Sequence, residues 1–126
     1  MDAYNDIFGT TAKALDLRSK RMELISSNIA NADVVGYKAK DMDFKKLMSK
    51  EMSGALNNTH AKHMGGVANG KTDYIYRVPI NPSENGNTVE MNYEQAQFGR
   101  ESTRYAATVQ FLESRVGGLR RALRGE

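Results

Sequence analysis

Apolar residues recur at alternating intervals of three and four in the first thirty and the last thirty residues of the chain. This spacing averages 3.5 residues and predicts helices that pair in a left-handed coil, because one stripe then faces a partner over many turns. We therefore expect the two end segments to pair with each other. The residues expected to hold the pair are Phe8, Leu15, Met22, Ile25 and Ile29 in the first segment and Tyr105, Val109, Leu112 and Leu119 in the last.

Turn signals set the bounds of the first elements. The first helix is predicted to run to about Asn31, after which Gly36 can adopt the left-handed conformation and turn the chain. Asp41 is predicted to cap a shorter amphipathic helix that reaches Leu56. The corner at Gly36 therefore separates a long helix from a short one.

The middle of the chain has little to bury. Residues 57–73 are rich in Asn, Gly, Lys and His and predict a mobile loop. Residues 74–78 favour a β conformation, and the prolines that follow, Pro79 and Pro82, confine it to an edge strand or an extended arm. The middle is therefore expected to be small and irregular.

The last helix is predicted to begin between Val89 and Asn92 and to run to about Leu123, because Asn92 and Gln95 have the spacing of a capping box. The predicted fold is mainly α, with a coiled-coil-like domain formed from discontinuous N- and C-terminal helices. The two halves of this domain are residues 1–36 and 87–126, and residues 37–86 form the middle region with its short helix, loop and β arm.

Some residues of the two long helices do not fit a simple hairpin. The apolar stripe by which each end segment faces its partner is called its seam. Leu17 and Leu24 lie away from the seam of the first segment, and Phe111 lies away from that of the last, so we expect them to contact neighbouring subunits. An ordinary surface position is the alternative for Phe111. Arg18 and Ser102 interrupt the seams, either to fix the register or the number of partners, or because the coil is loose there or faces a channel.

Composition narrows the function classes. The 126 residues are 40% hydrophobic with no Trp, which is enough to pair helices but little for a thick interior. Eighteen basic and fifteen acidic residues give a net charge of +3, which gives little support to nucleic-acid binding. The absence of cysteine excludes disulfides and thiolate sites.

No apolar run reaches the roughly 20 residues of a membrane span, and the N-terminus lacks the layout of a cleavable secretory signal. These features fit a cytoplasmic protein, and they fit equally a protein exported by a dedicated machine.

The sequence gives only weak evidence for a catalytic or metal-binding site. His60 and His63 stand three residues apart, but they lie in the loop rich in Gly and Asn. No further histidine or acidic residue follows at the sequence spacing of a known metal site. Paired acids at the starts of two predicted helices are explained by capping and by the helix dipole. We therefore expect no catalytic residue, metal site or cofactor. The acid pairs are Asp41 with Asp43 and Glu90 with Glu94.

One stretch resembles the sequence that bacterial flagellar rod, hook and hook-associated proteins share near their N-termini. It reads Ser27-Asn28-Ile29-Ala30-Asn31-Ala32-Asp33 and is followed by Gly36-Tyr37. Within that group, residues 41–44 and the stretch Gly86-Asn87-Thr88-Val89-Glu90-Met91 resemble the FlgB family of proximal rod subunits. Where relatives usually carry Thr-Pro before the Gly-Tyr, this sequence carries Val34-Val35, so the corner is expected to depend more on Gly36.

The resemblance implies a structural subunit of the flagellar rod, the drive shaft between the inner-membrane ring and the hook. In that family the terminal helices pair and pack with neighbours into a tubular inner layer. The implied partners are other copies of the chain, other rod subunits, the basal-body ring protein, the ring–rod adaptor and the flagellar type III export apparatus, which accounts for the missing signal. Another proximal rod subunit of the same family and a cytoplasmic helical adaptor or chaperone are the alternatives.

Overall fold

The computed structural model describes residues 2–57 and 74–125 and, within them, the side chains of residues 8–53 and 74–125. The predicted mobile loop lies outside the described residues apart from Asn57, and so do His60 and His63. The described chain is mainly helical, as predicted. Its elements are α1 (Asp2–Ala30), β1 (Lys40–Asp41), α2 (Phe44–Asn57), β2 (Ile75–Tyr76) and α3 (Met91–Arg124).

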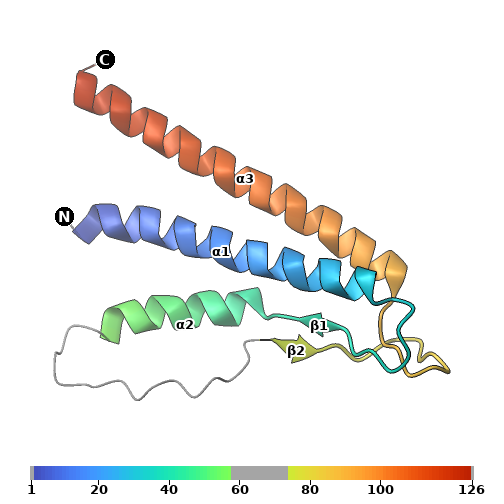
Figure 1. The fold of residues 1–126 in the computed structure, drawn as a ribbon. Coiled ribbons are helices and arrows are strands. Elements are labelled where there is room, and N and C mark those ends of the chain that lie inside the picture. The colour runs from blue at the N-terminus through green and yellow to red at the C-terminus, as the bar shows by residue number, and fades with distance from the viewer. Residues whose placement is uncertain (1, 58–73, 126) are drawn as a thin grey trace.

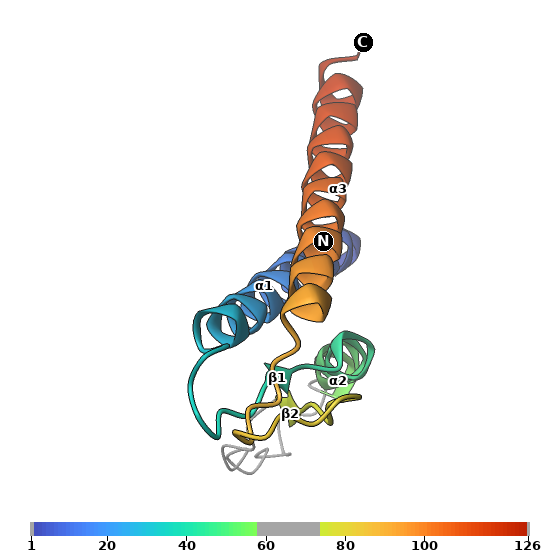
Figure 2. The ribbon, with the colours of Figure 1, turned by 90° about the vertical axis from the view of Figure 1, so that its right-hand side faces the viewer.

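The long helices α1 and α3 lie side by side and run in opposite directions (Figures 1 and 2). Their free ends lie at the same end of the molecule, and the two helices separate toward that end (Figure 1). In the described part of the chain, α2 packs on α1 and not on α3. The predicted pairing of the end segments is confirmed, and α1 is the central element.

A small apolar core lies between α1 and α2. Leu17 of α1 is buried with Met42 and Leu47, and Leu24 is half-buried against the same cluster. The expectation that Leu17 faces a neighbouring subunit is therefore corrected, whereas Leu24 is only half-buried and its contact with a neighbour stays a prediction. The second apolar face of α1 is covered by α2 of the same chain, because the short amphipathic helix folds back along α1.

The cap of α2 is Asp43 and not Asp41. Oδ1 of Asp43 accepts a hydrogen bond from the backbone N–H of Lys46 at 3.1 Å, which is the usual N-cap bond. Asp41 instead directs its carboxylate to Arg21 and Arg77. The predicted cap was wrong by two residues because a tertiary partner held the first acid.

The start of α3 has no capping box. Glu90 precedes Met91 in an extended conformation and makes no side-chain capping bond. Its carboxylate accepts a hydrogen bond from the backbone N–H of Ile80 at 3.1 Å. The predicted box of Asn92 and Gln95 was wrong, because both positions already lie inside the helix and are exposed.

The strands β1 and β2 form a two-stranded antiparallel sheet in which Lys40 pairs with Tyr76 and Asp41 with Ile75. In this sheet β1 lies against α1, and the β-prone segment, β2, lies on the far side of β1 (Figures 1 and 2). No helix in the described part of the chain has the length and apolar character that a membrane span requires. The sheet and the corner together position the site described next.

Candidate assembly interface

The corner after α1 is held by Asn87, from the segment that leads into α3. Its side-chain amide lies 2.9 Å from the carbonyl oxygens of Asn31 and Ala32 and 2.7 Å from that of Val34, and its two hydrogens are shared among these acceptors. Its Oδ1 accepts from the backbone N–H of Val89 at 2.8 Å. The stretches that resemble the rod family, far apart in sequence, therefore form one structure.

Backbone contacts join the same two segments. The N–H of Gly36 donates to the carbonyl of Asn85, and the N–H of Thr88 to that of Tyr37, both at 3.0 Å. Gly36 and Gly86 have φ of 74° and 75°, so the prediction of a left-handed Gly36 is confirmed. A Cβ on Gly86 would lie 3.7 Å from the Cα of Gly36. That distance is an ordinary van der Waals contact, so glycine is required at both positions by the left-handed backbone and not by lack of space.

Asn28 joins the corner to β1. It is fully buried, its Nδ2 donates to the carbonyl of Lys40 at 2.7 Å, and its Oδ1 accepts from the N–H of Lys40 at 3.0 Å. The hydroxyl of Tyr37 donates to the same oxygen at 3.3 Å. Asn31 donates to the carbonyl of Ser27 at 2.7 Å. Both asparagines of the family motif therefore hydrogen-bond to backbone at the end of α1 and around the corner.

Glu94 is a buried carboxylate at the junction of all these elements. It is fully buried, forms an ion pair with Arg77, and accepts a hydrogen bond from Asn28 at 3.3 Å. Arg77 also pairs with Asp41 at 2.9 Å and lies over the ring of Tyr93, 4.4 Å from its centroid. Arg77 therefore links the β2 arm to β1 and to the first turn of α3.

A second buried carboxylate, that of Glu101, fixes the register of α1 against α3. It is fully buried and pairs with Arg18 at 2.9 Å and with Arg21 at 2.8 Å. The guanidinium of Arg18 also lies 4.3 Å from the centroid of the Phe44 ring on α2. Of the interpretations of the interrupted seam, register fixing is the one that these contacts support at Arg18.

The groups that join Glu101 to β1 are held in their charged forms. Burial alone raises the pKa of Asp41, but the hydrogen bonds from Arg21 and Arg77 outweigh burial, and the net pKa lies below its ordinary value. Burial alone lowers the pKa of Arg21, but the bond and charge of Asp41, with those of Glu101, raise it overall. Asp41 and Arg21 therefore both stay ionised near neutral pH.

Sequence reasoning missed this network. Glu94 was explained as a first-turn acid, and Glu101 was not singled out. The available signal was that the two acids stand seven residues apart and so lie on one face of the helix, next to the apolar seam. The partner arginines could not be identified in the same way, because their placement depends on the register of the two helices.

The apolar seam between α1 and α3 is only partly covered. Ile25 is fully buried, near the corner end of the pair. The other residues expected to hold the pair are half-buried in this single chain, and they are Phe8, Leu15, Met22, Ile29, Tyr105, Val109, Leu112 and Leu119. A subunit that completes its burial against neighbours has this property.

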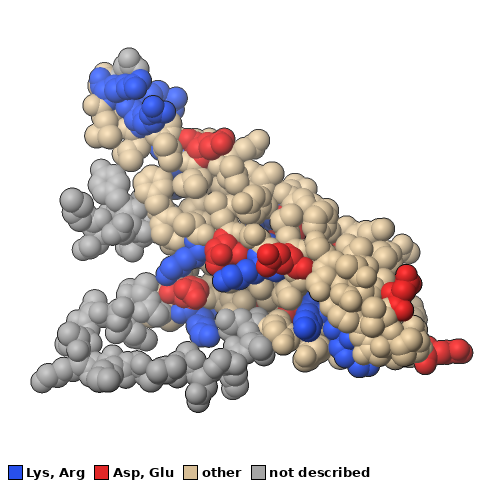
Figure 3. All heavy atoms as spheres, in the orientation of Figure 1, with Lys and Arg blue, Asp and Glu red and all other residues tan. Residues whose placement is uncertain are grey.

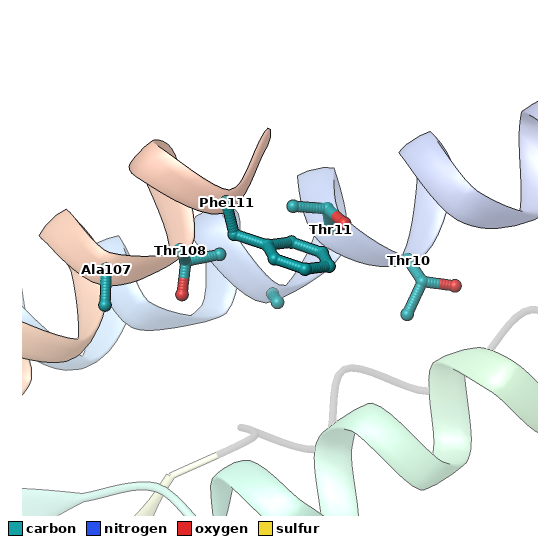
Figure 4. Close-up of a pocket in the computed structure, with 6 residues that line it drawn as sticks. Thr10, Thr11, Ala107, Thr108 and Phe111 are labelled. Atoms are coloured by element: carbon teal, nitrogen blue, oxygen red, sulfur yellow. The ribbon is translucent and has the colours of Figure 1, made fainter. Parts of the chain in front are cut away.

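A shallow apolar hollow opens between α1 and α3 where the helices begin to separate. The ring of Phe111 is half exposed and points across the hollow toward Thr10 and Thr11 of α1 (Figure 4). The remaining lining residues are Ala14, Ala107 and Thr108. Phe111 thus lies at a surface opening and not on the plain outer face of α3. Among the described residues no group of three or more His, Asp or Glu side chains is placed to hold a metal ion.

The comparisons with known proteins agree with this architecture. A family model described as flagella basal body rod protein matches residues 9–38, which comprise most of α1 and the corner. The chain is 42% identical to the flagellar basal body rod protein FlgB of Cereibacter sphaeroides, over the whole length of both chains. It belongs to the FlgB family of flagellar basal body rod proteins. Identity is 37% to FlgB of Aeromonas hydrophila, over 98% of this chain and 97% of that one. For FlgB of Salmonella typhimurium, identity is 41% over 90% of this chain and 89% of that one.

Membership in the FlgB family gives the described geometry a context. The rod-protein match covers most of the seam of α1, Asn28 and the left-handed Gly36. It therefore coincides with the elements that Asn87 and the ion pairs of Arg18 and Arg21 hold in place. The chain is therefore a structural rod protein of the flagellar basal body, and the half-buried helix pair is its candidate assembly interface.

Proposed function

We propose that this chain is a proximal rod subunit that assembles through α1 and α3 into the tubular drive shaft between the inner-membrane ring and the hook. The observation that supports this proposal is the partly covered seam of the α1–α3 pair, whose register is fixed by Glu101 while its apolar residues remain half-buried. Buried apolar area contributes about 25 cal/mol per Å², so neighbours that cover the seam stabilise both the helices and the assembly.

As a member of a rod family, the chain assembles with other components of the flagellar basal body. We infer the finer partners to be other copies of itself, neighbouring rod subunits, the basal-body ring protein, the ring–rod adaptor and, during export, the flagellar type III apparatus. The role is structural and requires no catalytic residue or cofactor.

Phe111 is the residue of this interface that we assign to contact between subunits. It is large, 51% exposed, and belongs to the apolar hollow between the paired helices. Aromatic side chains of this kind are frequent anchors of protein interfaces. Leu17 is not assigned this role, because it is buried against α2 of the same chain, whereas the half-buried Leu24 remains a candidate for such a contact.

The test is incorporation of the full-length chain into basal bodies. A strain that lacks the gene is complemented with the wild-type chain, with Leu112→Asp on the seam, or with Gln110→Asp on the exposed side of α3. We expect the wild-type chain and Gln110→Asp to copurify with basal bodies and to restore swimming, whereas Leu112→Asp does neither. A wild-type chain that stays in the cytoplasmic fraction, with rods assembled normally in its absence, would favour the helical adaptor instead.

A further inference from the structure

The corner presents two apolar side chains to solvent on a fixed turn. Val34 is 47% exposed, Val35 is 77% exposed, and the neighbouring Asp33 is exposed as well. Asn87 holds the carbonyl of Val34, and Gly36 is tied to the segment before α3. The turn is therefore ordered before it meets a partner, which lowers the entropy cost of docking.

The hollow between α1 and α3 has the complementary character. Its walls are apolar or carry threonine, with the half-exposed ring of Phe111 on one side. The guanidinium of Arg115 lies 4.8 Å from the centroid of that ring, and Arg104 is exposed one turn before the hollow. An apolar segment with a negative charge beside it matches such a surface.

Charge is distributed unevenly along the molecule. The exposed charged residues of α3 are six arginines and one acid, namely Arg100, Arg104, Arg115, Arg120, Arg121, Arg124 and Glu113. Basic side chains gather at the free end of α3, whereas acidic side chains appear at the end that carries the corner (Figure 3). Exposed acids of the corner segments include Asp33 and Glu84. The corner segments also carry the exposed Lys38, so the free end of α3 is strongly basic whereas the corner carries acids beside a single base.

We propose that the corner segment Asp33-Val34-Val35 of one copy docks in the hollow between α1 and α3 of a second copy. Val34 and Val35 enter the hollow beside Phe111, and Asp33 faces the arginines next to it on α3, Arg104 and Arg115. The inference rests on the proposed function, since it names the partner that covers part of the α1–α3 seam. A second copy is the occupant because the apolar pair and the acid that the hollow requires are both exposed on this same chain.

The geometry makes the contact heterologous. The hollow lies about 25 Å along α1 from the corner, at roughly 1.5 Å per helical residue. Each copy therefore keeps its own hollow free when its corner is engaged, and the contact can repeat from copy to copy. Repeated heterologous contacts produce rings or helical assemblies, which suits a subunit of a tubular shaft.

The experiment links the corner to the hollow with cysteines, since the chain has none of its own. The double variant Val35→Cys/Thr108→Cys places one cysteine at each site, and Val35→Cys/Thr103→Cys is the matched control. Thr108 and Thr103 both donate their hydroxyl to the carbonyl four residues earlier, at 2.8 Å and 3.0 Å, so each substitution removes the same kind of helix bond. Only Thr108 lines the hollow, whereas Thr103 is exposed elsewhere on α3.

A disulfide requires Cα atoms within about 7 Å, so cysteines at the corner and hollow of one chain cannot join each other, and each bond must link two copies. We expect mild oxidation of basal bodies containing Val35→Cys/Thr108→Cys to give a ladder of dimers, trimers and longer products, at least tenfold above the control. The same oxidation of the purified full-length variants at high concentration tests the contact even where a variant does not enter rods. We expect the same ladder there.

The absence of a ladder in both preparations, equal ladders for the two variants, or bonds formed only to a different protein would overturn the docking proposal. These results leave the proposed function intact as long as the wild-type chain is found in basal bodies. Absence of the wild-type chain from basal bodies is the separate result that removes the proposed function.

Discussion

The guanidinium of Arg21 lies 2.8 Å from Oε2 of the fully buried Glu101, although the two residues are 80 positions apart in sequence. The same guanidinium lies 3.0 Å from Oδ1 of Asp41 on β1. One side chain of α1 therefore positions both α3 and the small sheet. A torque-bearing subunit benefits from such a fixed register, because apolar seams alone permit two helices to slide past each other.

Removing the charge of Glu101 should be strongly destabilising. Glu101→Gln leaves Arg18 and Arg21 without their buried counter-ion, and breaking a buried ion pair by removing one partner costs about 3 kcal/mol or more. Urea unfolding of the full-length chain, followed by circular dichroism, measures the free energy of unfolding. Glu113→Gln on the exposed side of α3 is the control and should change it by less than about 0.5 kcal/mol. Equal stability of the two variants would contradict a role for Glu101 in register.

Asn87 should be required for an ordered corner. Asn87→Ala removes the donor that three corner carbonyls share, and buried acceptors without a partner cost about 1–3 kcal/mol. Asn87→Asp should be at least as damaging, because a carboxylate offers those carbonyls no hydrogen. Hydrogen exchange of the amides of residues 31–37, measured by mass spectrometry, should accelerate in both variants. Asn92→Ala, at an exposed position of α3, should leave that exchange unchanged.

Two glycines should respond to alanine with opposite signs. Gly36 has a φ of 74°, which costs an L-residue about 1–2 kcal/mol, so Gly36→Ala should lower the melting temperature. Gly99 lies inside α3 with open space around it, so Gly99→Ala should raise the melting temperature by relieving up to about 1 kcal/mol of helix cost. Thermal unfolding of both variants beside the wild-type chain measures the two shifts. A stabilising Gly36→Ala would show that the corner does not require the left-handed conformation.

Stability should fall in acid through Asp41. Its pKa in the folded chain is lowered from an ordinary value of 3.8, chiefly because the bonds from Arg21 and Arg77 outweigh the effect of burial. A lowered folded pKa means that the unfolded chain binds the proton more tightly, so this contribution is complete above pH about 4 and is lost as pH falls through the folded pKa. As the pH is lowered from 6 to 2, the free energy of unfolding should therefore decrease less steeply for Asp41→Asn than for the wild-type chain.

The control for this pH dependence is Asp16→Asn, which alters an exposed carboxylate that pairs with the exposed Lys20 four residues later. We expect its profile to follow that of the wild-type chain. If Asp41→Asn also followed the wild-type profile, the ionic link between Arg21 and β1 would not contribute to acid stability.

Local pattern alone determined the helices, the corner and the family. The alternating three- and four-residue spacing, the turn at Gly36 and the motif around Asn28 identified a mainly α rod subunit, because helix periodicity and left-handed glycine are properties of neighbouring residues. Only the tertiary structure decided which charges are buried, that Asp43 and not Asp41 caps α2, and that α2 covers Leu17. These outcomes depend on residues distant in sequence, which meet only after α1, α3 and the sheet have fixed their register.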